Sequence, residues 1–402
     1  MPFVVKNGDQ TSVSKYSKLT TNYYLRTMQL SHWEYDRYFK HVDVVIIGAG
    51  IVGLSAALYL KQQSPKQKIL VVERSFLPYG ASTRNAGFAC FGSITELQDD
   101  LTRMSEDEVF QLVEKRYKGL QRLRKNLGDN NIRFIPCGGY ELFTQQDDEV
   151  YQKAIAELPY FNRTIGKLLR KKDIYTKEDK QIKKFGFRNI EHLVKNRLEG
   201  QIDTGRMMDT LLQKVRNLGV NILTGIAVDS YEASGNSVVV HANGVAIKAK
   251  KLLICTNGFV KKLLPELDVE PARAQVLVTK PIKDLNWAGT FHYDRGYYYF
   301  RNIGNRILLG GGRNLDFKTE NTTEFGLTTL VQERLKELLY QTIAPGKSIE
   351  IERQWSGIMG LGASKKTIVQ EVDKNVFSAV RMGGMGVALG MMVGEEVAGM
   401  MV

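Results

Sequence analysis

The chain has 402 residues, of which 43% are hydrophobic, and a formal net charge of +13. This length allows a large core and predicts two intertwined domains. Three cysteines without CxxC spacing argue against a disulfide framework or a metal site and favour a reducing, cytoplasmic location.

Two local features suggest a protein without a membrane span. The first ten residues lack the basic-then-apolar order of a secretory signal. The longest apolar run, residues 44–60, is interrupted by glycines and is better explained by a buried strand, a turn and a helix. We therefore expect no transmembrane segment.

A βαβ unit begins near residue 42. The pattern predicts a strand over 42–47, a helix over 51–62 and a second strand over 68–73, which together imply a parallel sheet. Residues 1–40, before this unit, are polar and aromatic, and we expect an N-terminal extension packed on the body.

The turn between the first strand and the helix reads Gly48-Ala-Gly50-Ile-Val-Gly53, and Glu73 ends the second strand. Gly48 permits the tight turn, Gly50 lets the backbone approach a pyrophosphate, and Gly53 lets helix and strand pack closely. Helix amides attract the phosphates, and Glu73 can accept hydrogen bonds from an adenosine ribose. The pattern predicts dinucleotide binding but does not separate NAD from FAD.

Further elements follow in chain order. A capping box at Ser105–Glu108 predicts a helix that ends near Gly128, and Asp203 or Thr204 begins another that ends at Gly219. Strands are expected up to residue 255 and again over 272–310, and a last apolar helix over 385–401.

Residues 163–197 form a basic segment, with twelve Lys or Arg against four Asp or Glu. A solvated face is the simpler interpretation, because acidic residues are interspersed and no aromatic residues alternate with the basic ones as in single-strand binders. A surface for nucleic acid, anionic lipid or an acidic substrate stays open. We expect no specific nucleic-acid partner.

Two small-residue stretches carry a resemblance to a known family. They read Gly80-Ala-Ser-Thr-Arg-Asn-Ala-Gly87 and Gly383-Gly-Met-Gly-Val-Ala-Leu-Gly390. With the βαβ unit, KLLICTNG, YYYFRNIGNRILLGGGR and ERQWSGIMG in this order, the chain resembles the D-amino-acid oxidase and glycine oxidase family of flavoproteins. It is most similar to amine-oxidising members like gamma-glutamylputrescine oxidase.

The resemblance implies an α/β fold: a doubly wound, Rossmann-like FAD-binding domain beside a substrate domain with an antiparallel sheet. We expect the FAD domain to comprise residues 41–93, 190–262 and 353–402, and the substrate domain residues 94–189 and 263–352.

The resemblance also assigns cofactor contacts. Residues 82–87 would wrap the ribityl chain and pyrophosphate, Val228 would contact adenine, 256–258 would pass the phosphates, and 384–388 would meet the flavin ring. A glycine-rich helix start independently suits the negative charge of reduced flavin. The expected FAD contacts are Gly48, Gly50, Gly53, Glu73, Arg74, Ser82, Thr83, Arg84, Asn85, Ala86, Gly87, Val228, Thr256, Asn257, Gly258, Gly357, Gly384, Met385, Gly386, Val387 and Ala388.

Some members of the family attach FAD covalently through a histidine or a C-terminal cysteine. Here Arg84 stands at the histidine's place and Cys255 is the last cysteine, so we expect non-covalent FAD.

The substrate is expected to be a small amine or amino acid, with oxygen or a quinone as electron acceptor. Relatives that oxidise α-amino acids carry a carboxylate-binding arginine where Met359 stands, so a simple α-amino acid is less expected. Further candidates are Tyr298 and Phe300 over the substrate and Arg273 and Arg301 for an anion; each could instead be structural. No catalytic acid or base is assigned, because hydride transfer from a neutral amine mainly needs orientation.

Three alternatives stay open. They are a flavin-dependent 2-hydroxy-acid dehydrogenase, a tRNA-modifying flavin oxidase that binds RNA through its basic surface, and a partner-binding protein that has kept FAD for structure only.

Overall fold

The structure, a computed structural model, describes residues 29–285 and 287–402. Its first sheet is built on the predicted βαβ unit, which comprises β1 (Val42–Ile47), α3 (Ile51–Gln63) and β2 (Ile69–Glu73). β1 lies between β2 and β11 (Val245–Ile254) and is parallel to both. β8 (Asn221–Thr224) extends the sheet beside β2, and β18 (Val376–Val380) extends it beside β11, both in parallel. This confirms the doubly wound, Rossmann-like fold.

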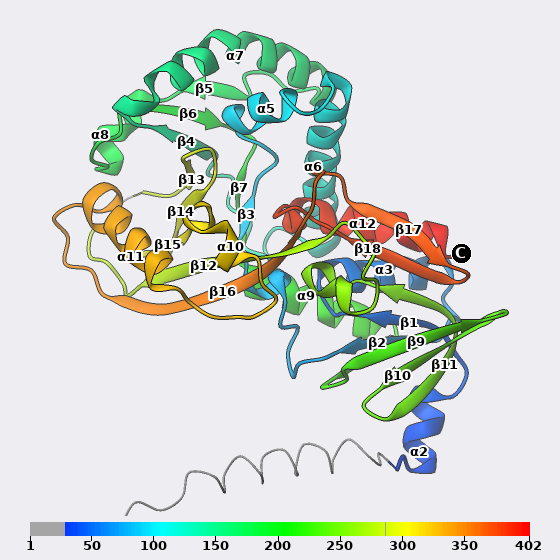
Figure 1. The fold of residues 1–402 in the computed structure, drawn as a ribbon. Helices are drawn as coiled ribbons and strands as arrows, with labels where there is room; N and C mark the ends of the chain where they lie inside the picture. The colour runs from blue at the N-terminus through cyan, green and yellow to red at the C-terminus, as the bar shows by residue number, and fades with distance from the viewer. Residues whose placement is uncertain (1–28, 286) are drawn as a thin grey trace, which may run out of the picture.

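Alternating side chains of β1 reach two different cores. Val44 and Ile46 pack toward the helical layer, whereas Val45 and Ile47 pack toward the hairpin β9–β10. Because both faces of the strand are covered, the sequence of β1 is apolar throughout, as is typical of a parallel strand. The helical layer consists of α3, α6 (Glu106–Leu127), α9 (Thr204–Asn217) and α12 (Gly386–Met400) (Figure 1).

Small residues let α12 lie close to its neighbours. A Cβ atom on Gly394 would stand 2.5 Å from Cβ of Ser55 on α3, and one on Gly119 of α6 would collide with the carbonyl oxygen of Ala388. These contacts hold α12 between α3 and α6, and the first turn of α12 borders the cavity described below.

The second sheet has eight strands in the order β16-β12-β15-β14-β13-β4-β6-β5, antiparallel except for the pair β13 and β4. One face packs on α11 (Thr329–Leu338) through an aromatic core, and the other faces the cavity. The strands in that order are β16 (Ile351–Leu361), β12 (Glu270–Thr279), β15 (Arg306–Gly311), β14 (Tyr298–Ile303), β13 (Thr290–Tyr293), β4 (Gly139–Phe143), β6 (His192–Asn196) and β5 (Tyr175–Lys177).

Strand membership differs from the expected domain boundaries. β6 and most of β16 fall in segments expected to belong to the FAD domain, yet they pair with β4 and β12 of the second sheet. Conversely α6, which is expected to belong to the substrate domain, packs on α12 of the first. These contacts join residues far apart in sequence, so local patterns do not reveal them.

Capping residues predicted the helix ends more reliably than the sequence predicted the domain boundaries. The Ser105 capping box begins α6, and Gly128, with φ +83°, ends it as predicted. Asp203 caps α9 through the amide of Arg206.

The other elements are short or peripheral. The expected N-terminal extension lies outside the described residues up to 28; α2 (His32–Glu34) and the π-helix η1 (Tyr35–Phe39) follow. No helix of the described chain is long and apolar enough to cross a membrane. The remaining elements are α4 (Ala81–Arg84), β3 (Phe88–Ala89), α5 (Ile94–Leu101), η2 (Gln145–Asp147), α7 (Asp148–Leu169), η3 (Asp179–Gln181), α8 (Ile182–Phe185), β7 (Gly200–Gln201), β9 (Val228–Ser234), β10 (Ser237–Ala242), η4 (Asn257–Lys262), η5 (Arg313–Leu315), α10 (Phe317–Glu320), η6 (Leu339–Ile343) and β17 (Ile368–Asp373).

Candidate active site

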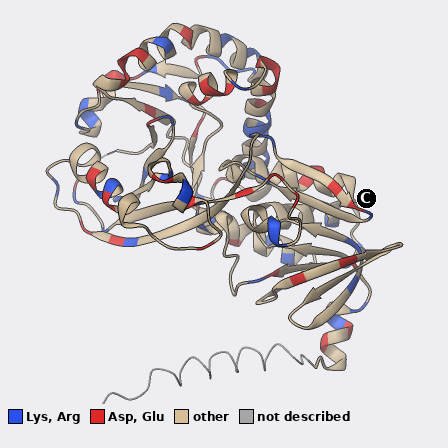
Figure 2. Cartoon of the chain, viewed as in Figure 1, with Lys and Arg blue, Asp and Glu red and all other residues tan. Residues whose placement is uncertain are grey.

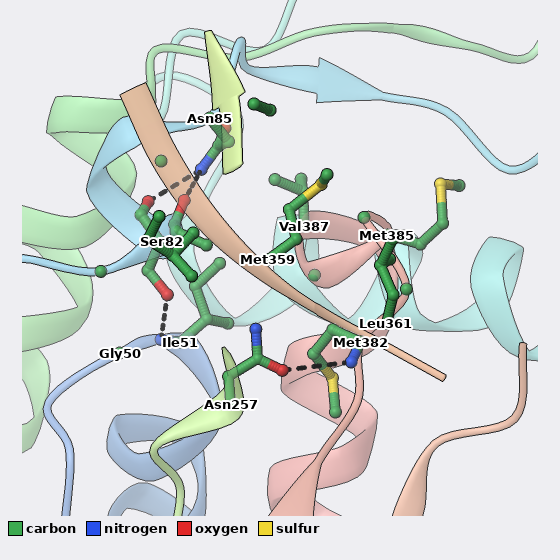
Figure 3. Close-up of a pocket in the computed structure, with 18 of the residues that line it drawn as sticks. Gly50, Ile51, Ser82, Asn85, Asn257, Met359, Leu361, Met382, Met385 and Val387 are labelled. Carbon is green, nitrogen blue, oxygen red and sulfur yellow. Dashed lines mark hydrogen bonds between the residues drawn. The ribbon is translucent and has the colours of Figure 1, made fainter. Parts of the chain in front are cut away.

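A cavity of about 960 Å³ is lined by residues of both sheets. It runs from the turn between β1 and α3, past α4 and the start of η4, to β16 and the first turn of α12 (Figure 3). This volume lies near the upper end of the range for cofactor and ligand sites. Its walls come from segments far apart in the chain, as expected for an FAD site.

The turn after β1 is shaped for close approach of a ligand to the backbone. Gly48 has φ +104°, and a Cβ atom there would stand 2.8 Å from the carbonyl oxygen of Cys255. A Cβ atom on Gly50 would stand 2.9 Å from the hydroxyl of Ser82, which accepts a hydrogen bond from the Ile51 amide at 3.0 Å. Polar groups and helix amides therefore meet in a space that only glycine keeps open.

Glu73, the acidic residue of the dinucleotide-binding pattern, lies beside this turn. Glu73 is buried at the end of β2, and its carboxylate accepts hydrogen bonds from the amides of Ala49 and Ser75, both at 3.2 Å. The carboxylate is thus held in place at the cavity wall, where its remaining lone pairs can accept ribose hydroxyls.

A second observation fits a polar ligand in the cavity. The hydroxyl of Thr256 is buried without a hydrogen-bond partner among the described residues, and Thr256 lines the cavity. Buried hydroxyls rarely stay unpaired. A phosphate or ribose oxygen of FAD would supply the missing partner, so the residues present fit the cofactor.

Asn257 shapes the glycine-rich turn before α12. It has φ +46°, and its side-chain oxygen accepts hydrogen bonds from the amides of Arg381 at 3.1 Å and Met382 at 3.3 Å. Gly383 and Gly384 then take φ +57° and +79°. Figure 3 shows the resulting turn near Met359. The start of α12 has no side-chain cap, and its residues Gly386 to Ala388 line the cavity. A helix start of this kind stabilises negative charge.

Arg84 lies between two aromatic rings. Its guanidinium carbon is 4.2 Å from the ring centre of Tyr79 and 4.8 Å from that of Phe325, and its backbone oxygen accepts a hydrogen bond from the Trp355 indole at 3.0 Å. Phe325 comes from the loop before α11, so a segment of the second sheet's domain closes over cavity-lining residues of the first. A similar stack joins Arg74 to Phe259, at 3.7 Å.

Among the expected cofactor residues, Gly53, Thr83 and Gly258 lie behind the cavity wall and the others line it. Gly53 allows α3 to pack against the Gly48 carbonyl, and Gly258 allows η4 to pack against the Met359 carbonyl. Thr83 donates a hydrogen bond to the Pro78 carbonyl at 2.6 Å.

The second sheet forms the opposite wall. One row of cross-strand neighbours runs Trp355, Val276, Gly310, Tyr299 and His292 on the cavity side. The ring of Tyr299 covers Gly310, where a Cβ atom would stand 2.6 Å from the ring. Burial raises the pKa of Tyr299 to about 12 and lowers that of His292 to about 4, so both side chains are neutral at pH 7.

Two expected aromatic candidates lie elsewhere. Tyr298 and Phe300 point into the aromatic core on the far side of the sheet, and their neighbours Tyr297 and Tyr299 line the cavity instead. Successive strand residues face opposite sides, so the expected face was shifted by one residue.

Arg273 and Arg301 also differ from the expected role. Arg273 faces away from the cavity and forms a buried ion pair with Glu320, with Nε–Oε2 at 2.8 Å and Nη2–Oε1 at 3.2 Å. Arg301 is buried behind Gly87 and donates a hydrogen bond to Gln201 at 3.0 Å. Neither lines the cavity, whereas Met359 does.

A cluster of buried acids adjoins the cavity and was not predicted. Burial raises the pKa of Glu199 to about 8 and that of Glu141 to about 7, although hydrogen bonds from backbone amides and hydroxyls oppose the rise. Burial would also raise the pKa of Glu96, but Arg116 and Lys365 lower it to about 2. The sequence offers no signal for this cluster, because Glu96 lies on α5, Glu141 on β4 and Glu199 in the turn before β7.

Comparison with known proteins agrees with this geometry. The chain is 22% identical over 391 residues to the probable oxidoreductase OrdL of Haemophilus influenzae, covering 89% of this chain and 82% of that protein. It is 22% identical to sarcosine oxidase subunit beta of Rhodobacter capsulatus, over 83% of this chain and 78% of that protein.

Solved structures share the fold. Glycine oxidase from Bacillus cereus superposes with a TM-score of 0.72 at 17% identity, covering 90% of this chain and 94% of that one. L-proline dehydrogenase from P. horikoshii gives 0.70 at 17% identity, covering 90% and 93%. The family described as FAD dependent oxidoreductase matches residues 43–400, nearly the whole chain. The chain belongs to this family and is an FAD-dependent oxidoreductase.

Proposed function

We propose that the protein oxidises a small amine or amino acid to an imine, with FAD as the hydride acceptor. The observation that carries the proposal is the neutral lining of the cavity near the start of α12: Val276, Tyr299 and His292 on the second sheet and Met359 beside the glycine turn carry no charge at pH 7. Such a surface suits a neutral amine, whose oxidation needs orientation and exclusion of water more than a strong base.

The chemistry divides between cofactor and chain. The carbon beside the amine nitrogen would lose a hydride to flavin N5, and water would hydrolyse the imine. The amides at the start of α12 would stabilise the negative charge that the reduced flavin carries. The protonated hydroxyl of Tyr299 and the neutral imidazole of His292 can hydrogen-bond a neutral amine without protonating it.

Non-covalent binding of FAD is part of the proposal. Arg84 stands where related proteins carry the linking histidine, and its guanidinium stacks on Tyr79 and Phe325. Cys90 and Cys255 line the cavity, but burial raises the pKa of both thiols, which makes them poor nucleophiles at neutral pH. Acid precipitation of purified protein should release intact FAD into the supernatant; colour retained in the pellet would contradict this.

Relatives suggest the substrate class. The names of the similar proteins include glycine oxidase, sarcosine oxidase subunit beta and L-proline dehydrogenase, which all act on amines that carry a carboxylate. Met359 in this chain borders Gly384, and its sulfur lies 3.6 Å from the position that a Cβ atom on Gly384 would take. A thioether cannot replace the two N–H donors with which a guanidinium binds a carboxylate. We therefore propose an amine without a simple α-carboxylate requirement.

Steady-state assays test the reaction type. The protein is incubated with panels of amines, amino acids and 2-hydroxy acids, and ammonia or a released amine, a carbonyl product and peroxide are quantified. Amines should yield one carbonyl per imine hydrolysed, with peroxide if oxygen is the acceptor and none if a quinone is. Turnover of hydroxy acids alone would favour the 2-hydroxy-acid dehydrogenase.

A further inference from the structure

Eight basic side chains line the cavity, and most have an assigned partner. Four form ion pairs with nearby carboxylates: Arg103 with Asp99, Lys262 with Asp229, Lys365 with Glu96 and Asp100, and Lys366 with Glu108. Arg74 and Arg84 stack on aromatic rings. Arg295 lies on an exposed turn. Arg313 is the one of the eight whose guanidinium keeps a buried N–H group without a partner among the described residues.

Arg313 is half-buried and held in a defined position. It follows Gly311 and Gly312, which take φ +122° and +78° and turn the chain out of β15. One Nη donates a hydrogen bond to Asn321 at 2.9 Å, and the guanidinium carbon lies 4.8 Å from the ring centre of Phe317. No carboxylate of the described residues lies within 4.0 Å of it.

The guanidinium has unused hydrogen-bonding capacity. Its Nε is buried without a partner among the described residues. Burial also lowers the pKa of Arg313, which reflects a cost of keeping the charge away from water. The charge of Glu320 opposes this fall in pKa, but Glu320 forms its ion pair with Arg273. A carboxylate oxygen in the cavity would pair directly with the N–H group and the charge of Arg313.

Three partly exposed apolar or aromatic side chains lie near Arg313. Tyr297, Leu315 and Phe317 are about two-fifths exposed beside it, at 41%, 38% and 43%. The Tyr297 ring centre lies 6.2 Å from that of Phe317, and the Tyr297 carbonyl accepts a hydrogen bond from the Gly312 amide at 3.0 Å. A charge flanked in this way suits an aliphatic chain that ends in a carboxylate.

Arg313 is separated from Met359 across the sheet. β15 lies two strands from β16, with β12 between them, so the backbones of these two strands stand about 10 Å apart, and Arg313 follows the end of β15. Met359 borders the glycine turn where the flavin ring is expected. A ligand with its reacting carbon near Met359 and its carboxylate on Arg313 must therefore have several bonds between the two groups.

We propose that Arg313 binds the substrate carboxylate and that the substrate is an amine whose carboxylate lies several bonds from the oxidised carbon, as in an ω-amino acid. This inference rests on the proposed amine oxidation. In this proposal the group that binds the substrate carboxylate lies just after β15, and not at the position of Met359.

The test compares ω-amino acids with amines of equal chain length. Gamma-aminobutyrate, delta-aminovalerate and epsilon-aminocaproate are each paired with butylamine, pentylamine and hexylamine, and kcat/KM is measured for holoenzyme. At least one acid should exceed its matched amine by roughly tenfold to a hundredfold, the range of a charge-assisted hydrogen-bond pair. Arg313→Gln should abolish this preference, because the variant removes the charge that pairs with the carboxylate.

Binding provides a readout that does not depend on turnover. Valerate, which has the carboxylate but no amine, should perturb the flavin spectrum of the wild type and bind at least about tenfold more weakly to Arg313→Gln. Arg306→Gln is the matched control, because Arg306 begins β15, the strand that precedes Arg313, and pairs with Glu352 at the surface. If Arg313→Gln does not fold, Arg313→Lys, which keeps the charge but loses the planar fork, should weaken valerate binding severalfold.

The outcomes separate the two proposals. An unchanged valerate affinity in the folded Arg313 variant, or an acid-to-amine preference that the variant keeps, overturns the role of Arg313 and leaves amine oxidation standing. If no amine or amino acid is turned over but valerate binding still depends on Arg313, the proposed reaction fails while the anion site stands.

Discussion

The guanidinium of Arg273 and the carboxylate of Glu320 form a two-point ion pair in the protein interior, at 2.8 and 3.2 Å. Gln275 and Thr328 donate further hydrogen bonds to the same carboxylate, at 2.9 and 3.0 Å. The amide of Gly326 also donates to the Ser356 hydroxyl, at 3.0 Å. This network fixes the loop 321–328, which carries Phe325 to the cavity wall, so a residue expected to bind an anion instead positions a loop.

Breaking the pair should cost stability. Arg273→Gln leaves Glu320 as a buried, uncompensated charge and should lower the free energy of unfolding by roughly 3–5 kcal/mol. Denaturant unfolding of the wild type and variant measures the difference. Glu352→Gln, in the exposed pair with Arg306, is the control and should change it by less than about 1 kcal/mol. A similar small change in both variants would contradict the stabilising role of the buried pair between Arg273 and Glu320.

The same pair predicts a pH dependence. Burial would raise the pKa of Glu320, but hydrogen bonds from Arg273, Gln275 and Thr328 outweigh it and lower the pKa below the usual 4.5. The stabilisation is therefore present above that value and is lost as the pH falls through the lowered pKa. The difference between wild type and Arg273→Gln should be largest at neutral pH and shrink in acid; a difference that grows in acid would contradict the assignment.

Phe325→Ala should accelerate the release of FAD. Phe325 contacts Tyr79 at 4.9 Å and Phe259 at 6.1 Å between ring centres, and Arg84 stacks on it. Losing contacts worth about 1–2 kcal/mol should raise the dissociation rate roughly fivefold to thirtyfold. Fluorescence of released flavin follows the rate directly. Leu327→Ala, an exposed neighbour on the same loop, should release FAD at the wild-type rate; equal rates in both variants would exclude the closing role of Phe325.

Glu73→Ala should weaken FAD binding more than folding. Loss of charge-assisted hydrogen bonds to the ribose should cost about 1.5–3 kcal/mol, or roughly tenfold to a hundredfold in Kd. Because Glu73 also accepts the Ala49 and Ser75 amides, Glu73→Gln is a useful partner variant that keeps one acceptor oxygen and should lose less affinity. Titration of apo-protein with FAD measures both, and an unchanged Kd in the alanine variant would mean that the adenosine lies elsewhere.

Local sequence signals predicted the elements around the cofactor well. The strand over 42–47, the capping box at Ser105 and the glycine turn before α12 depend on neighbours within a few residues, so their patterns are visible in the chain. The long-range partners are not. Glu320 is 47 residues from Arg273, and nothing near either residue marks the pair.

The residues of the second sheet that line the cavity could not be predicted from the sequence, for a different reason. Residues 297–300 read Tyr-Tyr-Tyr-Phe, an aromatic run with no polar alternation, because one face packs on the core and the other lines the cavity. Such a run does not reveal which residues face the substrate. Arg313 was not singled out either, because a glycine-arginine turn after a strand has many structural uses and its lack of an acidic partner appears only in three dimensions.

The basic segment 163–197 should bind RNA only weakly. Its acidic residues neutralise part of the charge: Asp179 pairs with Lys177 at 3.1 Å and contacts His192 at 3.0 Å. Figure 2 shows basic and acidic positions interspersed along α7, whose last turns begin this segment. We expect tRNA to bind no tighter than about 10⁻⁶ M at physiological salt. Neutralising Lys171, Lys172, Lys183 and Lys184 together should leave amine turnover nearly unchanged; submicromolar tRNA binding that these four changes abolish would favour the tRNA-modifying alternative.

Anaerobic reduction of the bound flavin tests amine oxidation most directly. Holoenzyme is mixed without oxygen with matched amines, α-amino acids and 2-hydroxy acids, and the loss of visible flavin absorbance is followed in time. Amines, with or without a remote carboxylate, should bleach the flavin faster than glycine, sarcosine or any D-amino acid, because Met359 offers no guanidinium to an α-carboxylate. Bleaching by 2-hydroxy acids alone, or fastest by an α-amino acid at millimolar concentration, would contradict this account.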